Sequence, residues 1–212
     1  MIKTNINPKL FFIIKICIVY LIICLKSFAD DTSIQKNTVV IGSYDALVKI
    51  KVFSSLTCPH CATFHIKVVP EIKKEYIESG KVQIIFIDFP LDQAAFNASK
   101  LLHCLDKKKQ IAFLDIIYEN QNEWTKGSTI NDINNNLKKI VKNLGISSLQ
   151  FDKCLVDEVI SDKILNERIE ANKKYSIDST PTIIINEKKL QGSVNFKNIK
   201  KKNRKNYLNY EI

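Results

Sequence analysis

Residues 53–65 read Phe-Ser-Ser-Leu-Thr-Cys-Pro-His-Cys-Ala-Thr-Phe-His and lie where a predicted strand is followed by a predicted helix. The apolar residues before the two cysteines alternate with lysines, which is the period of a strand: Val48, Ile50 and Val52. The apolar residues after them recur at helical spacing: Phe64, Val68 and Ile72. Cys58 is therefore predicted at a helix N-terminus, with Pro59 in the first turn, where its missing N–H costs no hydrogen bond.

The helix start gives the two cysteines of this stretch different chemistry. The free N–H groups and the positive end of a helix favour an anion, so we predict a lowered pKa for Cys58. Cys61 lies three residues on and one turn deeper. Cys58 is therefore the predicted catalytic nucleophile and Cys61 its catalytic resolving partner. Pro59 and His60 lie between them and are predicted to tune the pair, with His60 adding an N–H donor or a positive charge. A stabilised thiolate favours the reduced form and makes the disulfide a strong oxidant.

A metal site is the alternative interpretation of the same stretch. Its ligands would be two cysteines and two histidines: Cys58, Cys61, His60 and His65. A structural zinc site commonly takes a second pair of ligands at matching spacing. The next cysteine, Cys104, stands by itself in the sequence. The spacing therefore favours a redox pair, and we predict no metal and no organic cofactor.

A second motif lies far downstream, where residues 179–186 read Ser-Thr-Pro-Thr-Ile-Ile-Ile-Asn. Together with residues 53–65 and Pro70, it resembles the DsbA-like thiol:disulfide oxidoreductases of the thioredoxin superfamily. The resemblance covers roughly residues 39–192. It implies an α/β chain with a thioredoxin fold and an inserted helical domain. It also implies a cis bond between Thr180 and Pro181, facing Cys58, with the Thr180 backbone binding the backbone of the substrate.

The chain departs from this pattern at one position. Many thioredoxin-like proteins place a buried acid six residues before the nucleophile, where it helps to move the proton of the deeper cysteine. Val52 stands at that position here, and the neighbouring Lys51 should point to the other face of the strand. No acid–base residue is therefore assigned from the sequence.

The first 29 residues have the pattern of an export signal. Lys3 and Lys9 precede an uncharged apolar core, residues 16–25, and small residues at 27–29 suit a cleavage site. We therefore predict periplasmic localisation after cleavage, with retention as a membrane anchor facing the periplasm as the alternative. Export leaves four cysteines in the mature chain.

About ninety residues separate the third predicted strand from the second motif, which is too long for a loop in a compact domain. Their apolar periodicity predicts helices throughout, and residues 155–175 continue in helix. Two helix starts carry capping patterns, Thr129 with Asp132 and Ser147 with Gln150. Cys104 and Cys154 both fall here. In an oxidising compartment they favour a structural disulfide, and two separate buried thiols remain the alternative. His103 is interpreted as a satisfied residue rather than a ligand, and Trp124 as packing.

Charge is concentrated at the two ends of the chain. The formal net charge is +10; four lysines before Asp30 account for +4, and residues 197–212 for +5, which leaves about +1 between them. A nucleic-acid-binding domain would carry its basic surface on the fold itself, so this function is excluded. Disorder is predicted beyond Lys200, with a frayed helix, a contact with an anionic membrane or a truncated reading frame as the alternatives.

These patterns predict the following organisation: signal peptide 1–29, flexible lead-in 30–38, thioredoxin-like core 39–91 and 177–196, inserted helical domain 92–176, and basic tail 197–212. The predicted function is to introduce disulfides into exported cysteine-containing proteins, as a monomer, with a membrane-bound oxidase for regeneration. A disulfide isomerase or reductase on the same fold is one alternative. A thioredoxin-fold binding module or soft-metal carrier is the other.

Overall fold

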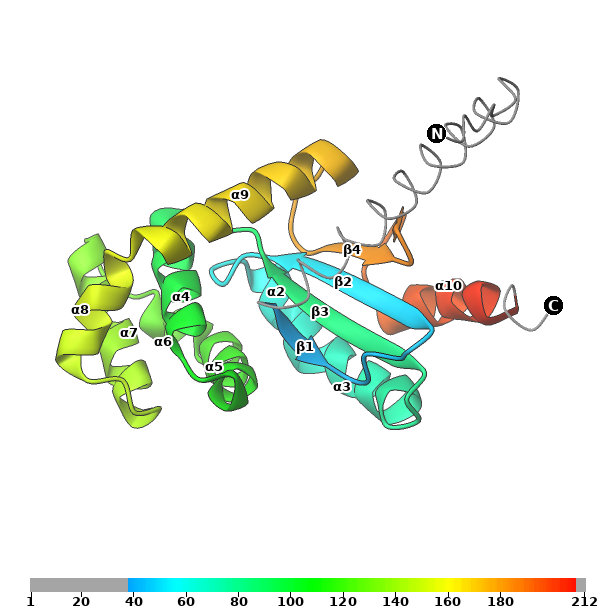
Figure 1. The fold of residues 1–212 in the computed structure, drawn as a ribbon, viewed down its shortest axis with the longest axis horizontal. Helices are drawn as coiled ribbons and strands as arrows, with labels where there is room; N and C mark the ends of the chain where they lie inside the picture. Colours follow the sequence, from blue (N-terminus) through cyan, green and yellow to red (C-terminus); the bar gives the residue numbers. More distant parts are fainter. Residues whose placement is uncertain (1–37, 209–212) are drawn as a thin grey trace, which may run out of the picture. The chain divides into compact units, whose positions relative to one another are not determined.

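A five-stranded mixed sheet is the centre of the computed structural model, which describes residues 38–208 (Figure 1). Its spatial order is β1-β3-β2-β4-β5. The strands are β1 (Val39–Ile41), β2 (Val48–Ser54), β3 (Val82–Asp88), β4 (Thr182–Ile185) and β5 (Lys188–Lys189). The central strands β2 and β3 are parallel, and the other neighbours pair antiparallel. The parallel pair brings Ser54 beside Asp88 at the ends of the two strands.

Both faces of the sheet are covered, which explains why β3 is buried along its whole length. Val48, Ile50 and Val52 point into the larger apolar cluster, which also contains Cys61. Phe53 points into a second, smaller cluster on the other face. Strand alternation alone decides this division, because successive side chains point to opposite faces.

The segment that follows β2 lies on the larger cluster and is not one regular α-helix. It consists of α2 (Pro59–Thr63), the π-helical turn η1 (Phe64–Val68), α3 (Val69–Ile72) and a second π-helical turn, η2 (Lys73–Ile77). Pro70 has no N–H to donate to the preceding turn, which accounts for an irregular hydrogen-bond pattern next to it. The three residues at helical spacing, Phe64, Val68 and Ile72, are all buried, as the sequence predicts. The segment nevertheless alternates between α-helical and π-helical turns.

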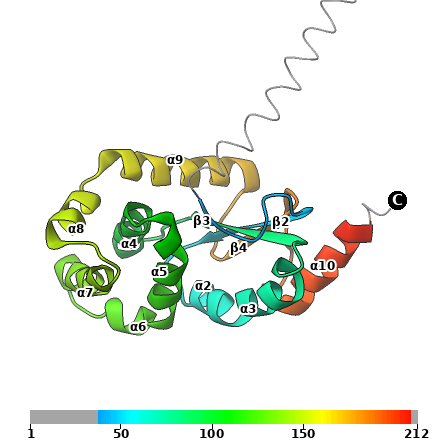
Figure 2. The ribbon, with the colours of Figure 1, turned by 60° about the horizontal axis from the view of Figure 1, so that its bottom comes forward.

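Six helices connect β3 to β4. They are α4 (Gln93–Cys104), α5 (Lys107–Glu119), α6 (Gln121–Trp124), α7 (Ile130–Asn143), α8 (Ser148–Leu155) and α9 (Glu158–Tyr175). The capping boxes at Thr129 with Asp132 and at Ser147 with Gln150 are both present, as the sequence predicts. Figure 2 shows α4 to α8 gathered beside the sheet and α9 running back across it.

The segment predicted to continue in helix from Leu155 to Tyr175 is helical except for a break at residues 156–157. The chain turns at Val156, and Asp157 starts α9 as a new N-cap whose carboxylate accepts a hydrogen bond from the Ile160 N–H at 3.0 Å. An aspartate that can accept from the N–H three residues on favours a helix start over a helix interior.

Cys104 at the end of α4 and Cys154 in α8 form a disulfide, with their Cα atoms 6.1 Å apart. Trp124 is 1% exposed and donates its indole N–H to the Ile117 carbonyl at 2.9 Å. It therefore packs within the helices, as the sequence indicates.

The prediction of disorder beyond Lys200 is wrong, because the backbone of residues Phe196–Leu208 forms helix α10. Ile199 is fully buried in the larger apolar cluster. Lys200 pairs with Glu75 at 2.6 Å, and the Phe196 ring lies 6.3 Å from the Tyr76 ring. Contacts with Glu75 and Tyr76 of η2 thus stabilise a helix whose own sequence is rich in lysine.

The predicted signal peptide, and all but the last residue of the lead-in, lie outside the described residues. Over residues 38–208, no helix is both long enough and apolar enough to span a bilayer.

Candidate active site

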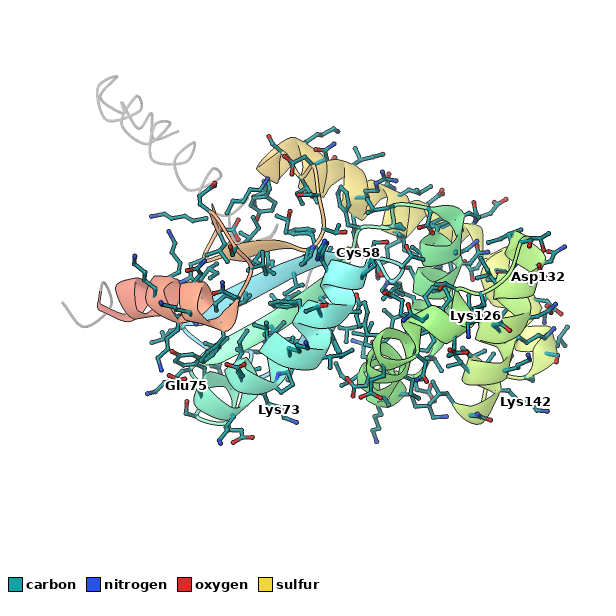
Figure 3. The ribbon with its side chains drawn as sticks, turned by 180° about the vertical axis from the view of Figure 1, so that it is seen from behind. Cys58, Lys73, Glu75, Lys126, Asp132 and Lys142 are labelled. Carbon is teal, nitrogen blue, oxygen red and sulfur yellow. A yellow bond between two sulfur atoms is a disulfide. The ribbon has the colours of Figure 1, made fainter. Side chains whose placement is uncertain are left out.

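Cys58 is the N-cap residue of α2, in extended conformation at φ −80°, and Pro59 opens the helix (Figure 3). Its thiol is partly exposed, whereas Cys61, in the first turn, is 1% exposed. Both are free thiols in this structure. The structure thus presents one cysteine to a substrate and covers the other.

The pKa of the Cys58 thiol is lowered to about 5. The hydrogen bond from the Cys61 thiol is the largest cause, and the backbone N–H groups of Cys61 and His60 add to it, against the opposing effect of burial. These N–H groups are the unpaired donors of the helix start. The lowered pKa predicted from the position of Cys58 at the helix start is therefore found, although the Cys61 thiol lowers this pKa more than the backbone N–H groups do.

The pKa of the Cys61 thiol is shifted in the opposite direction. Burial raises the pKa of its thiol, and the adjacent Cys58 thiolate raises it further. Cys61 is therefore protonated at neutral pH while Cys58 is ionised. An exposed anionic sulfur beside a covered neutral one is the arrangement that a nucleophile and its resolving thiol require.

The second motif lies directly against Cys58, although 122 residues separate the two in sequence. The Thr180–Pro181 bond is cis. The Thr180 carbonyl oxygen lies 3.3 Å from the Cys58 sulfur. β4 follows at once and pairs Thr182 with Phe53 of β2, so the sheet itself fixes this loop beside the active-site helix.

Two polar residues that the sequence analysis does not single out hold the loop before Cys58. Gln121, which is buried, donates from Nε2 to the carbonyl oxygens of Leu56, at 2.8 Å, and Cys58, at 3.2 Å. Asp92 accepts from the Thr57 hydroxyl at 2.6 Å while its other oxygen caps α4. The N-cap pattern before α4 could have pointed to Asp92. No local pattern points to Gln121.

An apolar side chain, Val52, stands six residues before Cys58, where many thioredoxin-like proteins have a buried acid. Val52 is 1% exposed and packs in the same cluster as Cys61. Lys51 points to the other face, where it pairs with Glu187 and lies 3.4 Å from the Tyr175 hydroxyl. Its predicted direction is therefore correct.

Neither of the two buried histidines belongs to a cluster of metal ligands in the described part of the chain, where no group of three or more His, Cys, Asp or Glu side chains could hold an ion. His103 bonds to Asp88 at 2.7 Å, which agrees with its interpretation as a satisfied residue. His65 bonds to Asp115, also at 2.7 Å.

Comparison with known proteins agrees with this geometry. A family model described as thioredoxin matches residues 34–202. The chain belongs to the thioredoxin family. Its relatives include a protein of Rickettsia bellii named as a protein-disulfide oxidoreductase, 28% identical over 76% of this chain and 62% of that protein. The matched region thus spans less than two thirds of that relative.

Two further relatives of this thioredoxin-family chain are matched over more of their length. A disulfide bond formation protein D of Bacillus cereus is 32% identical over 69% of this chain and 68% of that protein. The crystal structure of alpha-DsbA1 of Wolbachia pipientis is 30% identical, covers 81% of this chain and 91% of its own, and superposes with a TM-score of 0.73. The predicted fold class, a thioredoxin fold with an inserted helical domain, is confirmed.

The lowered pKa of Cys58 predicts a specific alkylation profile for this thioredoxin-family protein. Because the thiolate is the reactive form, the rate of alkylation of the reduced protein by iodoacetamide should rise with pH to half its plateau near pH 5. Mass spectrometry should find the label on Cys58, with Cys61 unlabelled in the folded protein. A midpoint near the ordinary thiol value of about 8.5 would contradict the assigned electrostatics.

Proposed function

We propose that the protein is an exported thiol:disulfide oxidoreductase that transfers its Cys58–Cys61 disulfide to cysteine-containing proteins. The observation that carries the proposal is the stabilised Cys58 thiolate beside a protonated Cys61 thiol. Stabilising the thiolate favours the reduced pair and makes the disulfide an electron acceptor. The names of the relatives, protein-disulfide oxidoreductase and disulfide bond formation protein, support the same activity.

The proposed reaction has two thiol–disulfide exchange steps. A substrate thiolate attacks the Cys58 sulfur and breaks the Cys58–Cys61 bond, and Cys61 leaves and takes up a proton. The second substrate thiolate then attacks the substrate sulfur of the mixed disulfide and expels the Cys58 thiolate. The substrate loses two electrons and gains a disulfide, and the cysteine pair is reduced. The Thr180 carbonyl, next to Cys58, is placed to accept a backbone N–H of the bound substrate.

The compartment and partners belong to the same proposal. The apolar, lysine-flanked start of the chain supports export to the periplasm. Each cycle leaves Cys58 and Cys61 reduced, so the pair has to be reoxidised, and we propose a membrane-bound oxidase as the partner that does so. We propose that the protein works as a monomer, without a cofactor.

Two alternative functions, a disulfide isomerase or reductase and a soft-metal carrier, can be separated from this proposal by experiment. Thr180 before Pro181 also occurs in isomerases of this fold, which keep the nucleophile reduced. A soft-metal carrier would bind one metal equivalent through Cys58 and Cys61. Metal analysis of the purified protein separates a carrier from both kinds of redox enzyme.

The reduction potential of the pair tests the proposed direction. Equilibration with glutathione buffers should give a value near the oxidising end, about −120 mV, and not near the thioredoxin value of about −270 mV. A value close to thioredoxin's would replace the proposed oxidant with a reductase or isomerase.

The dependence of this potential on pH adds a second readout. Since Cys58 binds no proton above its pKa of about 5, reduction at pH 6 to 8 takes up one proton, on Cys61. The potential should therefore fall by about 30 mV per pH unit in this range. A slope of about 60 mV would mean that both thiols bind protons, contrary to the lowered pKa.

A further inference from the structure

His65 is a buried histidine in η1, one turn after Cys61, and only one of its two ring nitrogens has a hydrogen-bond partner. Its side chain is 5% exposed, and its Nε2 lies 2.7 Å from Asp115 Oδ1 of α5. The Asp115 side chain is 52% exposed, so this bond leads from the core toward solvent. Among residues 38–208, nothing hydrogen-bonds to the other ring nitrogen, Nδ1, which is buried.

The bond to Asp115 fixes the chemistry of the ring. An ionised carboxylate can only accept hydrogen bonds, so Nε2 carries the proton and neutral His65 keeps a lone pair on Nδ1. A buried acceptor left without a donor destabilises the folded state and requires an explanation. A base that is oriented by a carboxylate and has a free lone pair is the arrangement that accepts a proton from a thiol.

The surroundings of His65 place this lone pair in the same buried region as Cys61. Helical side chains lean toward the N-terminus, over the preceding turn, and for His65 that turn begins at Cys61. The ring packs against Tyr118, with centroids 4.9 Å apart, and against Phe86 at 5.5 Å. Tyr118, Phe86 and Cys61 all belong to the larger apolar cluster. His65 therefore packs against two residues of the cluster that also covers Cys61.

Cys61 needs such a base, because it must lose its proton whenever the disulfide is re-formed. Its burial keeps it protonated at neutral pH. The nearby strand offers no acid, since Val52 is apolar and Lys51 points away. Asp115 and Tyr118 on α5 contact His65, and Cys61 and Cys58 lie one turn and two turns before it. Asp88 of β3 acts on Tyr118 through its charge, but its carboxylate is already bonded to Ser99 and His103. Burial raises the pKa of Tyr118, which makes its hydroxyl a poor acid or base.

We propose that His65 accepts the proton of Cys61 when the active-site disulfide closes, and returns it when the disulfide is opened by a substrate. The proposal rests on the function proposed above. In closure, Cys58 is already joined to an oxidant sulfur. His65 Nδ1 takes the proton of Cys61, directly or through one water, and the Cys61 thiolate attacks the Cys58 sulfur. The oxidant thiolate leaves, and the new imidazolium is stabilised by Asp115. No electrons pass through His65.

Closure can be measured separately from the step before it. The protein with its Cys58–Cys61 pair reduced and its Cys104–Cys154 disulfide intact is mixed with oxidised glutathione, quenched with acid at set times and analysed by mass spectrometry. The Cys58–glutathione mixed disulfide reports the first step, which needs only the Cys58 thiolate. Its disappearance into the Cys58–Cys61 disulfide reports closure, which needs the Cys61 proton to leave.

His65→Gln is the informative variant, because a glutamine amide can still donate to Asp115 while it lacks the base. At pH 7 the rate of closure in this variant should be about 100-fold lower than in the unmodified protein, within the range of general base catalysis. The closure rate of the variant should then rise tenfold for each unit of pH, because it depends on the fraction of Cys61 that has lost its proton. Formation of the mixed disulfide should be unchanged. His103→Gln makes the same substitution in a second histidine–aspartate pair, with Asp88, and should leave both steps unchanged.

Asp115→Asn tests the same mechanism at a half-exposed position where folding is not at risk. It keeps an acceptor for Nε2 and removes the charge that stabilises the imidazolium, so closure should slow several-fold. The proposal is overturned if His65→Gln closes as fast as His103→Gln, if both steps slow equally, or if Asp115→Asn closes at the unmodified rate. If the unmodified protein itself never forms a mixed disulfide with glutathione, the proposed function fails instead.

Discussion

Replacing Cys58 with alanine should abolish disulfide exchange, whereas replacing Cys61 with alanine should trap it half-way. In the structure Cys58 is the accessible, ionised sulfur, and Cys61 is covered and protonated. Without Cys58 no mixed disulfide can form. Without Cys61 the mixed disulfide forms and cannot be displaced from within the protein. Mass spectrometry after incubation with oxidised glutathione should show no adduct for Cys58→Ala and one lasting adduct for Cys61→Ala.

The second cysteine pair supplies a matched control for this experiment. The variant with both Cys104→Ala and Cys154→Ala loses cysteines at a separate place in the fold and keeps both Cys58 and Cys61. It should still form the Cys58 adduct and release it by closure. An adduct on Cys58→Ala, or rapid release from Cys61→Ala, would reverse or remove the assigned roles.

The same double variant should lower the free energy of unfolding by roughly 4 kcal/mol. The Cys104–Cys154 bond closes a loop with a sequence separation of 50, and it ties the end of α4 to α8. In the chain-entropy description, its loss increases the freedom of the unfolded chain and so favours unfolding. Urea unfolding of the oxidised protein and of the double variant, each followed by circular dichroism, measures the difference.

The control for this measurement is the unmodified protein with only its active-site pair reduced, which keeps the structural disulfide. A loss below about 1 kcal/mol in the double variant would show that the helices pack well enough without the bond. The bond would then contribute little to stability through the entropy of the unfolded chain.

The sequence by itself determined the parts of this protein that depend on local patterns. Strand alternation correctly assigned Val52 and Lys51 to opposite faces of β2. The position of Cys58 before Pro59 indicated a helix N-terminus and hence a lowered thiol pKa. The capping boxes at Thr129 and Ser147 marked the starts of two helices. Each of these features depends on residues within four positions of one another, so it can be read along the chain.

The local patterns failed where distant contacts decide the structure. The lysine-rich helix α10 exists because Ile199 is buried and Lys200 reaches Glu75, more than a hundred residues earlier. Gln121 supports the Cys58 loop from 63 residues away, and Asp115 reaches His65 from 50 residues away. Helices and strands that pack together bring such residues into contact without leaving a periodic pattern in the sequence. The sequence thus placed Cys58 at a helix start with Cys61 one turn further on, and the tertiary structure decided which groups surround them, because burial and hydrogen bonding depend on the whole fold.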